Sequence, residues 1–187
     1  MEKYAAPVED MSFILTNVLD IDNYLKSINN KELSFDSLKM IIEEAGKFAC
    51  DELDTINQIG DQEGIKLENG VVRMPESFIK AYKNFVNTGW FSIIGEKKYG
   101  GQDLPLSAVV MINEIWHSTN MSFATNNMLT QGAVELLESH GNEKQKEYYL
   151  PNLISGKWSG TMNLTEPHAG SDLSSIKTKA IEKDKKF

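Results

Sequence analysis

Apolar residues recur every three or four positions over most of the first 157 residues, which is the spacing of amphipathic helices. The clearest stripe begins after Ser34, which together with Asp36 offers candidates for the helix cap. Its apolar members are Leu38, Ile41, Ile42, Ala45, Phe48, Ala49, Leu53 and Ile56. The pattern predicts a long helix with one buried face.

The stretch before this helix and the stretch after it are less regular. Residues 1 to about 30 carry an apolar patch at 11–15, which predicts one helix that docks on the main body, with 20–23 ending it or starting a second turn. Residues 57–74 contain three glycines and predict a surface loop with short extended pieces at 65–67 and 71–73.

Four more helices are predicted before residue 157. Pro75 opens the first at its first helical position, and Gly89 stops it. The second begins at Leu106 and has apolar residues on several sides. The third covers 122–139, with a predicted inward stripe of Met128, Leu129, Ala133, Leu136 and Leu137. The fourth begins at a capping box formed by Asn142 and Gln145, and Pro151 closes it.

The period changes to two only after residue 158. A short apolar piece at 162–164 is typical of a strand end, residues 176–181 alternate like a strand, and 184–187 look like the start of a turn. Because an isolated strand pair is marginal in water, these strands indicate the beginning of a larger sheet. We therefore expect a mainly α chain in which an N-terminal extension (1–30) and an all-helical domain (31–157) precede the truncated start of a β domain (158–187).

Composition and charge exclude several classes of function. The 187 residues carry 19 basic and 27 acidic side chains, so the net charge is 19 − 27 = −8, which argues against binding to nucleic acid. No apolar run is long enough to predict a membrane span, and the first seven residues lack the pattern of a signal peptide. The single cysteine, Cys50, is expected to be a small buried residue and suits the cytoplasm. Three scattered histidines give no metal site.

The candidate chemistry lies in residues 160–172 (GTMNLTEPHAGSD). Pro167 forces the chain out of regular structure, and the small residues that follow allow a ligand to approach the backbone. Thr165 and Ser171 contribute hydroxyls, with backbone N–H groups between them. Such a loop is suited to a flat polar ring edge or a phosphate, although a plain polar turn between two strands has the same local features.

Two motifs together identify a family resemblance. Residues 164–172 (LTEPHAGSD) closely resemble the flavin-binding signature of the acyl-CoA dehydrogenases, and residues 99–105 (YGGQDLP) resemble that family's Tyr-Gly-Gly connector. The resemblance covers essentially all 187 residues, and the start is similar to the N-terminal extension of the longer family branch. It implies an N-terminal helical domain, then a β domain, then a second helical domain.

The resemblance also implies FAD as cofactor, α,β-dehydrogenation of an acyl-CoA in fatty acid metabolism, and electron-transfer flavoprotein as electron acceptor. Residues 162–164 would offer backbone groups to the flavin, Thr165 a hydroxyl near its N5 and O4, and Ser171 a hydrogen bond to the pyrophosphate or a contact with acyl-CoA. Glu166 and Pro167 would shape the turn, and His168 would be a loop side chain. The implied cofactor contacts are Met162, Asn163, Leu164, Thr165, Gly170 and Ser171, and Ser171 is also the implied substrate contact.

No catalytic residue is implied within these 187 residues, because the family's proton-abstracting glutamate belongs to the C-terminal helical domain. We therefore expect an N-terminal fragment that is inactive alone and binds FAD weakly or not at all. Its expected partners are a C-terminal half or further copies of itself. The alternative is a non-catalytic remnant or interaction subunit that complements a separately encoded C-terminal half. The sequence departs from the family at Asn163, where many members have cysteine or alanine, and at 95–98, where the usual proline is missing.

Overall fold

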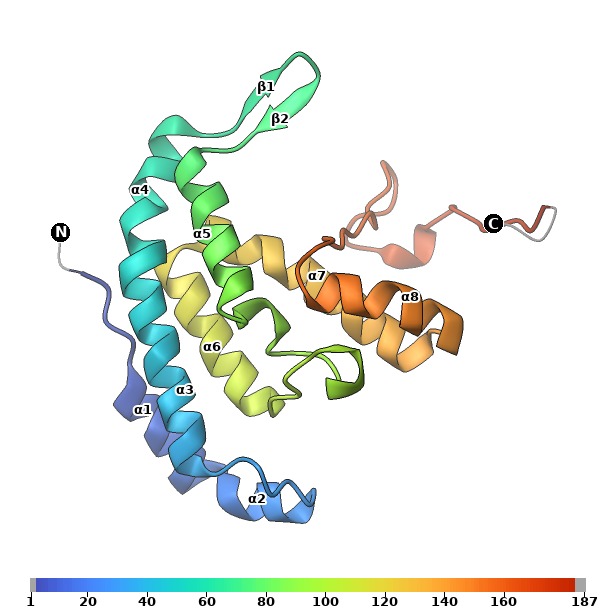
Figure 1. Cartoon of the computed structure of the whole chain (residues 1–187). Coiled ribbons are helices and arrows are strands. Elements are labelled where there is room, and N and C mark those ends of the chain that lie inside the picture. Colours follow the sequence, from blue (N-terminus) through green and yellow to red (C-terminus); the bar gives the residue numbers. More distant parts are fainter. Residues whose placement is uncertain (1–2, 184–187) are drawn as a thin grey trace.

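The computed structural model describes residues 3–183 and confirms a mainly helical chain with one small hairpin (Figure 1). The predicted turn at 184–187 lies outside the described residues. The regular elements are α1 (Val8–Phe13), α2 (Ile21–Ser27), α3 (Phe35–Phe48), α4 (Asp54–Glu63), β1 (Lys66–Glu68), β2 (Val71–Arg73), α5 (Glu76–Asn87), α6 (Leu106–Thr119), α7 (Met121–His140) and α8 (Glu143–Ile154). Short 3-10 turns occur at Trp90–Ser92, Lys97–Tyr99 and Leu173–Ser175.

The long predicted helix is present as α3 and α4, joined by a π-helical segment, Ala49–Leu53. Ser34 rather than Asp36 caps it, because the Ser34 hydroxyl accepts the Ser37 amide in a capping box. The eight predicted apolar positions are buried or pack against the core, which confirms the stripe. Cys50 is half-buried rather than buried, since it lies at the edge of this stripe.

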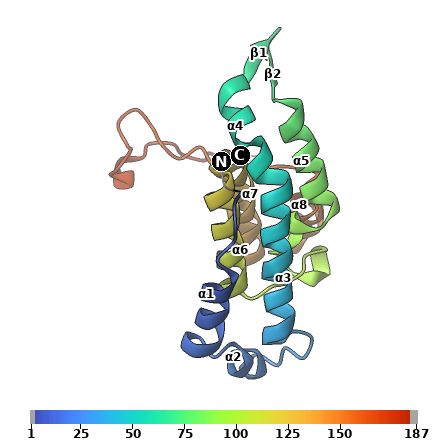
Figure 2. The same cartoon turned by 90° about the vertical axis from the view of Figure 1, so that its left-hand side faces the viewer.

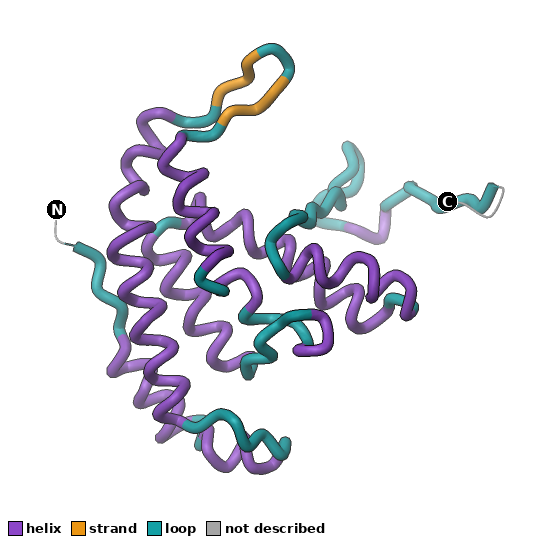
Figure 3. Tube along the Cα trace, in the orientation of Figure 1, coloured by secondary structure: helices purple, strands orange, loops and turns teal. Residues whose placement is uncertain are grey.

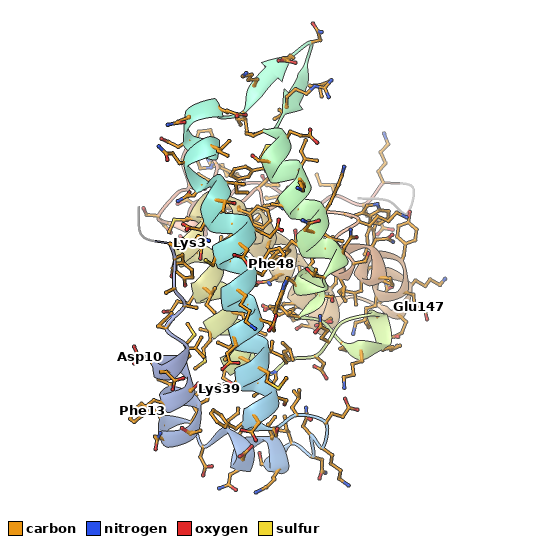
Figure 4. All side chains as sticks on the ribbon, turned by 60° about the vertical axis from the view of Figure 1, so that its left-hand side comes forward. Lys3, Asp10, Phe13, Lys39, Phe48 and Glu147 are labelled. Carbon is orange, nitrogen blue, oxygen red and sulfur yellow. The ribbon has the colours of Figure 1, made fainter. Side chains whose placement is uncertain are left out.

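The N-terminal patch at 11–15 forms one continuous helix, as predicted, and the alternative of a second turn after residue 20 is present as α2. A π-helical segment, Ile14–Val18, extends α1, and Asp20 in a left-handed conformation (φ 46°) separates it from α2. Figure 4 shows this segment lying against α3, where Lys39 pairs with Glu9 at 3.1 Å, whereas Phe13 points away from the body. Met11 and Leu15 supply the buried contacts of the segment.

The core is built around aromatic rings from four helices and one connector. Trp116 of α6 is 1% exposed, and its ring lies 5.3 Å from Phe85 of α5, 5.3 Å from Trp90 and 5.8 Å from Phe48 of α3. Figure 4 shows Phe48 pointing from α3 into the bundle. Phe123 extends the cluster onto α7, with its ring 5.5 Å from Phe85. These edge-to-face contacts tie α3, α5, α6 and α7 together.

Several predicted helix ends are wrong by a few residues. Pro75 is the residue before α5 rather than its first member, and Thr88 and Gly89 (φ 86°) end that helix as expected. Pro151 lies inside α8, which continues to Ile154. A proline in the last turn costs one N–H bond to the carbonyl of Glu147, and that residue is exposed, so water can satisfy the group.

The predicted inward face of α7 is wrong in part. Ala133 and Leu137 pack against the core, but Met128 and Leu136 are 51% and 61% exposed. The buried residues are Phe123, Ala124, Asn127, Thr130, Gln131 and Val134. Two of the three buried polar residues have polar partners. The Asn113 amide of α6 donates to Gln131 at 3.3 Å, and Thr130 accepts the amide of Gly160 at 3.1 Å.

The predicted extended pieces at 65–67 and 71–73 form the hairpin β1–β2, in which Leu67 lies opposite Val72. This hairpin projects beyond α4 and α5 (Figure 1). The strands predicted at 162–164 and 176–181 are absent, since neither stretch pairs with another described strand. A β-strand needs the hydrogen bonds of a neighbour, so alternation alone does not form one.

Candidate functional site

The segment that carries the predicted site leaves the helical body after α8. Figure 3 shows it as loop with one short helical turn, and Figures 1 and 2 both show it extending away from the bundle. Its first anchor is Gly156, whose carbonyl accepts the Tyr82 hydroxyl at 2.8 Å. Gly156 has a φ of 70°, and an added Cβ would lie 2.7 Å from the Val86 side chain. Only glycine suits both conditions.

A second anchor joins the segment to α7. The Gly160 amide donates to the Thr130 hydroxyl at 3.1 Å, and an added Cβ at Gly160 would lie 2.7 Å from the Cβ of Ala133. Between the two anchors, the Trp158 ring lies 5.6 Å from the ring of Tyr148 on α8. The start of the site loop is therefore fixed against α5, α7 and α8.

Beyond Gly160 the chain is open to solvent. Among residues 161–183, Ala169 is the only buried one. Pro167 and His168 form a tight turn, because the amides and carbonyls of Glu166 and Ala169 bond to each other in both directions at 3.0 Å. This antiparallel pair places Thr165 beside Gly170, so the structure brings two of the predicted contact residues together.

The backbone amides of the predicted contact residues are available as hydrogen-bond donors to a ligand. None of their amides donates a hydrogen bond to any residue in the described range 3–183. The residues concerned are Met162, Asn163, Leu164, Thr165, Gly170 and Ser171. All six are exposed, so water satisfies these groups in the free chain and a ligand with acceptor atoms can replace that water.

The loop has two carboxylates, and each is occupied by neighbouring donors. Glu166 accepts the amides of Lys177 and Thr178 at 3.0 and 2.9 Å and also the Thr178 hydroxyl. The Thr178 hydroxyl, followed by the two amides, lowers the pKa of Glu166. Asp172 caps the turn Leu173–Ser175, and the hydroxyl and amide of Ser174 lower the pKa of Asp172.

Neither carboxylate has the environment of a general base, since both are held in the ionised form by donors of the loop itself. His168 contacts Glu166, with Nε2 3.1 Å from Oε2, and is 41% exposed. The expected role of Glu166 in shaping the turn agrees with this geometry. Sequence reasoning missed its bonds to Lys177 and Thr178, because the partners are eleven and twelve residues away and no local pattern marks them.

The Tyr-Gly-Gly connector lies in the body rather than in the loop. Tyr99 is 7% exposed and packs with Val134, Leu150, Leu153 and Ile154 of α7 and α8. An added Cβ at Gly101 would lie 1.9 Å from the carbonyl oxygen of Gly95. The motif therefore supports the helices from which the site loop emerges.

A groove of about 420 Å³ lies beside the root of the loop, between α5, α7 and residues 156–159. Phe78 and Phe123 give it an apolar lining, to which Lys83 and Lys157 add charge. None of the six predicted contact residues lines it, and the sequence analysis did not find it. Across residues 3–183, no helix has both the length and the apolar character needed to cross a membrane.

The comparisons with known proteins agree on one family. Residues 36–157 match the family described as "Acyl-CoA dehydrogenase, N-terminal domain". The chain is 40% identical over 181 residues to 3-methylmercaptopropionyl-CoA dehydrogenase of Ruegeria pomeroyi, and the match covers 97% of this chain and 31% of that protein. It is 29% identical over 187 residues to a butyryl-CoA dehydrogenase of Syntrophomonas wolfei, with 98% and 30% covered.

Solved structures give the same result. An acyl-CoA dehydrogenase from Bacillus anthracis, solved in complex with FAD, superimposes with a TM-score of 0.63 at 25% identity, covering 79% of this chain and 23% of that one. The chain thus spans less than a third of the length of the curated relatives it matches.

Proposed function

Since the chain belongs to the acyl-CoA dehydrogenase family and matches its N-terminal domain, we propose that it forms the N-terminal part of an FAD-dependent acyl-CoA dehydrogenase. Such an enzyme introduces an α,β double bond into an acyl-CoA thioester. Within it, residues 1–30 would be the N-terminal extension, 31–157 the helical domain and 158–187 the start of the β domain. By itself the chain would not turn over substrate.

The exposed loop at 161–171 is the observation that carries this proposal. It presents six backbone amides that donate to no residue within 3–183, and the hydroxyls of Thr165 and Ser171. The edge of a flavin ring and the pyrophosphate of FAD offer acceptors, so this donor set fits the cofactor. Ser171 would also contact the acyl-CoA.

FAD would supply the redox chemistry by accepting a hydride from the substrate. The chain's own contribution would be to bind and orient the cofactor through residues 162–165 and 170–171. The substrate's α-proton would go to a base outside these residues, because the nearest carboxylate, Glu166, is engaged with Lys177 and Thr178.

The relatives suggest which substrates to test. Their names specify butyryl-CoA and 3-methylmercaptopropionyl-CoA, both thioesters of short acyl chains. We propose a short-chain acyl-CoA as substrate, a place in fatty acid metabolism in the cytoplasm, and electron-transfer flavoprotein as acceptor. The remaining contacts would come from a C-terminal half or a second copy.

Purified protein tests the proposal in two steps. The chain alone is expected to lack stoichiometric flavin absorbance and to give no turnover of either thioester with an artificial electron acceptor. Turnover by the chain alone would contradict the proposal that the proton-abstracting base lies outside these residues. A mixture with a separately produced C-terminal portion of the relative from Ruegeria pomeroyi should gain flavin. If the mixture stays colourless, the non-catalytic alternative is favoured.

A further inference from the structure

Glu166 connects two parts of the site loop that are far apart in the sequence. Its main chain closes the turn 166–169 through the two bonds with Ala169. Its side chain reaches the far end of the loop, where Oε2 accepts the Lys177 amide and Oε1 accepts the amide and hydroxyl of Thr178. A single residue therefore closes both the inner turn and the loop of residues 166–178.

Burial provides little of the force that closes this loop. Ala169 is its only buried residue within the range 166–178, so the apolar surface removed from water is small. Closing a loop of this length costs conformational entropy, which hydrogen bonds must offset. Bonds to an ionised carboxylate are roughly twice as strong as neutral ones. The Glu166 side chain is 17% exposed, and its three hydrogen bonds lie at the surface of the molecule.

The chemistry of the three donors is specific for a carboxylate. Two amides and one hydroxyl approach the two oxygens of Glu166, and a carboxylate offers acceptor sites on both. A glutamine has one oxygen and one NH₂ group. Its NH₂ group would face one of these donors and could not accept a hydrogen bond from it. A conservative Glu166→Gln change therefore breaks the arrangement although the size of the side chain is unchanged.

We propose that Glu166 is a positioning residue that holds the loop 166–178 closed, so that Thr165, Gly170 and Ser171 stand in the geometry that binds the cofactor. Thr165 precedes the residue that closes the loop, and Gly170 lies opposite it across the Glu166–Ala169 pair. Ser171 adjoins Asp172, which caps the turn that leads to Lys177. This inference rests on the proposed function, because it assigns the closed loop to a flavin.

The test uses the ¹⁵N-labelled chain, alone to read closure and mixed with the separately produced C-terminal portion to read FAD binding. Exchange of the Lys177 and Thr178 amides with water reports closure, and FAD-induced shifts of residues 162–165 and 170–171 report binding. We expect Glu166→Gln and Glu166→Ala to accelerate exchange at both amides about tenfold, as the loss of a charge-assisted hydrogen bond would. FAD-induced shifts should fall severalfold.

Two further variants serve as controls. Thr178→Val removes one of the three donors and should give an intermediate acceleration at residues 177 and 178. Glu182→Gln neutralises an exposed carboxylate of the same segment and should change neither reading. Helix signals of α3 and α6 should stay unchanged in every variant, which separates positioning from general unfolding.

The outcomes distinguish the two claims. Unchanged exchange in Glu166→Gln and Glu166→Ala overturns the closing role. Faster exchange with undiminished FAD-induced shifts overturns the positioning role. If FAD shifts no loop signal in the wild-type mixture, the flavin assignment fails, while exchange at Lys177 and Thr178 in the chain alone still decides whether Glu166 closes the loop.

Discussion

The helical body and the segment after Gly160 are stabilised in different ways. In the body, rings from α3, α5, α6 and α7 pack around Trp116 within a large cluster of buried apolar residues. In residues 161–183 nearly every side chain is exposed, and the shape depends on donors gathered by Glu166 and Asp172. Burial of apolar surface fixes the body, whereas charge-assisted hydrogen bonds fix the loop.

This difference makes the two regions separable. The loop joins the body through Gly156 and Gly160, and the contacts that shape it lie within residues 166–178. A change in the loop should therefore leave the helices intact, while a change in the core should unfold both. A ligand site benefits from such an arrangement, because the binding residues can adjust on a rigid support.

The largest expected effect comes from the centre of the core. Trp116→Ala should lower the free energy of unfolding by about 3–5 kcal/mol, because it removes a fully buried ring from between three helices. Urea denaturation followed by circular dichroism measures this. Leu106→Ala, at a side chain on the same helix that is 67% exposed, is the control and should cost little. A loss below about 1 kcal/mol for Trp116→Ala would contradict the central role of the ring.

Two glycine variants should act in opposite directions. Gly101→Ala forces a Cβ to within 1.9 Å of the Gly95 carbonyl, so the connector must shift at a cost of about 1–3 kcal/mol. Gly132→Ala, inside α7 with no atom within 4 Å of the added Cβ, should gain about 0.5–1 kcal/mol. Thermal unfolding of both variants measures the two changes in stability. If both variants change stability in the same direction, the packing described for the connector is wrong.

Much of the helical body could be predicted from the sequence. The stripe behind Ser34 was identified correctly, because this helix faces an apolar core on one side and water on the other. The face of α7 was predicted only in part. Its buried residues include Thr130 and Gln131, which bond to Gly160 and Asn113, and partners on other elements cannot be read from the helix's own sequence.

The site was predicted in part. The small residues around Pro167 correctly indicated a turn, and the structure places Thr165 beside Gly170. The strand expected at 176–181 is absent. Alternation of apolar and polar residues predicts which side of a strand is buried, but it does not provide the neighbouring strand that must pair with it. The bonds between Glu166 and Thr178 could not be foreseen, since they depend on how twelve intervening residues turn.

Acid should open the loop only at a pH below the ordinary carboxyl pKa. The pKa values of Glu166 and Asp172 are lowered by donors that the unfolded loop lacks, so their contribution is fully present above the ordinary carboxyl pKa of about 4. That contribution is lost as the pH falls through the lowered values. Amide shifts of Lys177 and Ser174 should titrate in this range while helix circular dichroism stays constant.

A matched variant isolates the carboxylate in that titration. His168 also contacts Glu166, so His168→Gln keeps the Glu166 bonds to Lys177 and Thr178 while removing the second titratable group. Its acid titration should keep the same direction. A titration that disappears in His168→Gln would contradict the assignment of the effect to the Glu166 carboxylate.

The smallest expected effect tests which face of α7 is buried. Met128 is 51% exposed, so Met128→Gln should change the free energy of unfolding by no more than about 0.5 kcal/mol. Val134→Asn on the same helix, at a residue that is 3% exposed, should cost about 2 kcal/mol or more, because it buries an amide without a partner. Chemical denaturation of the two proteins gives both values. If Met128→Gln costs as much as Val134→Asn, the apolar face of α7 is packed in solution and the helix is oriented as its sequence pattern alone predicts. A negligible cost at Met128 together with a large one at Val134 would confirm that the face through Val134, and not the face through Met128, is buried.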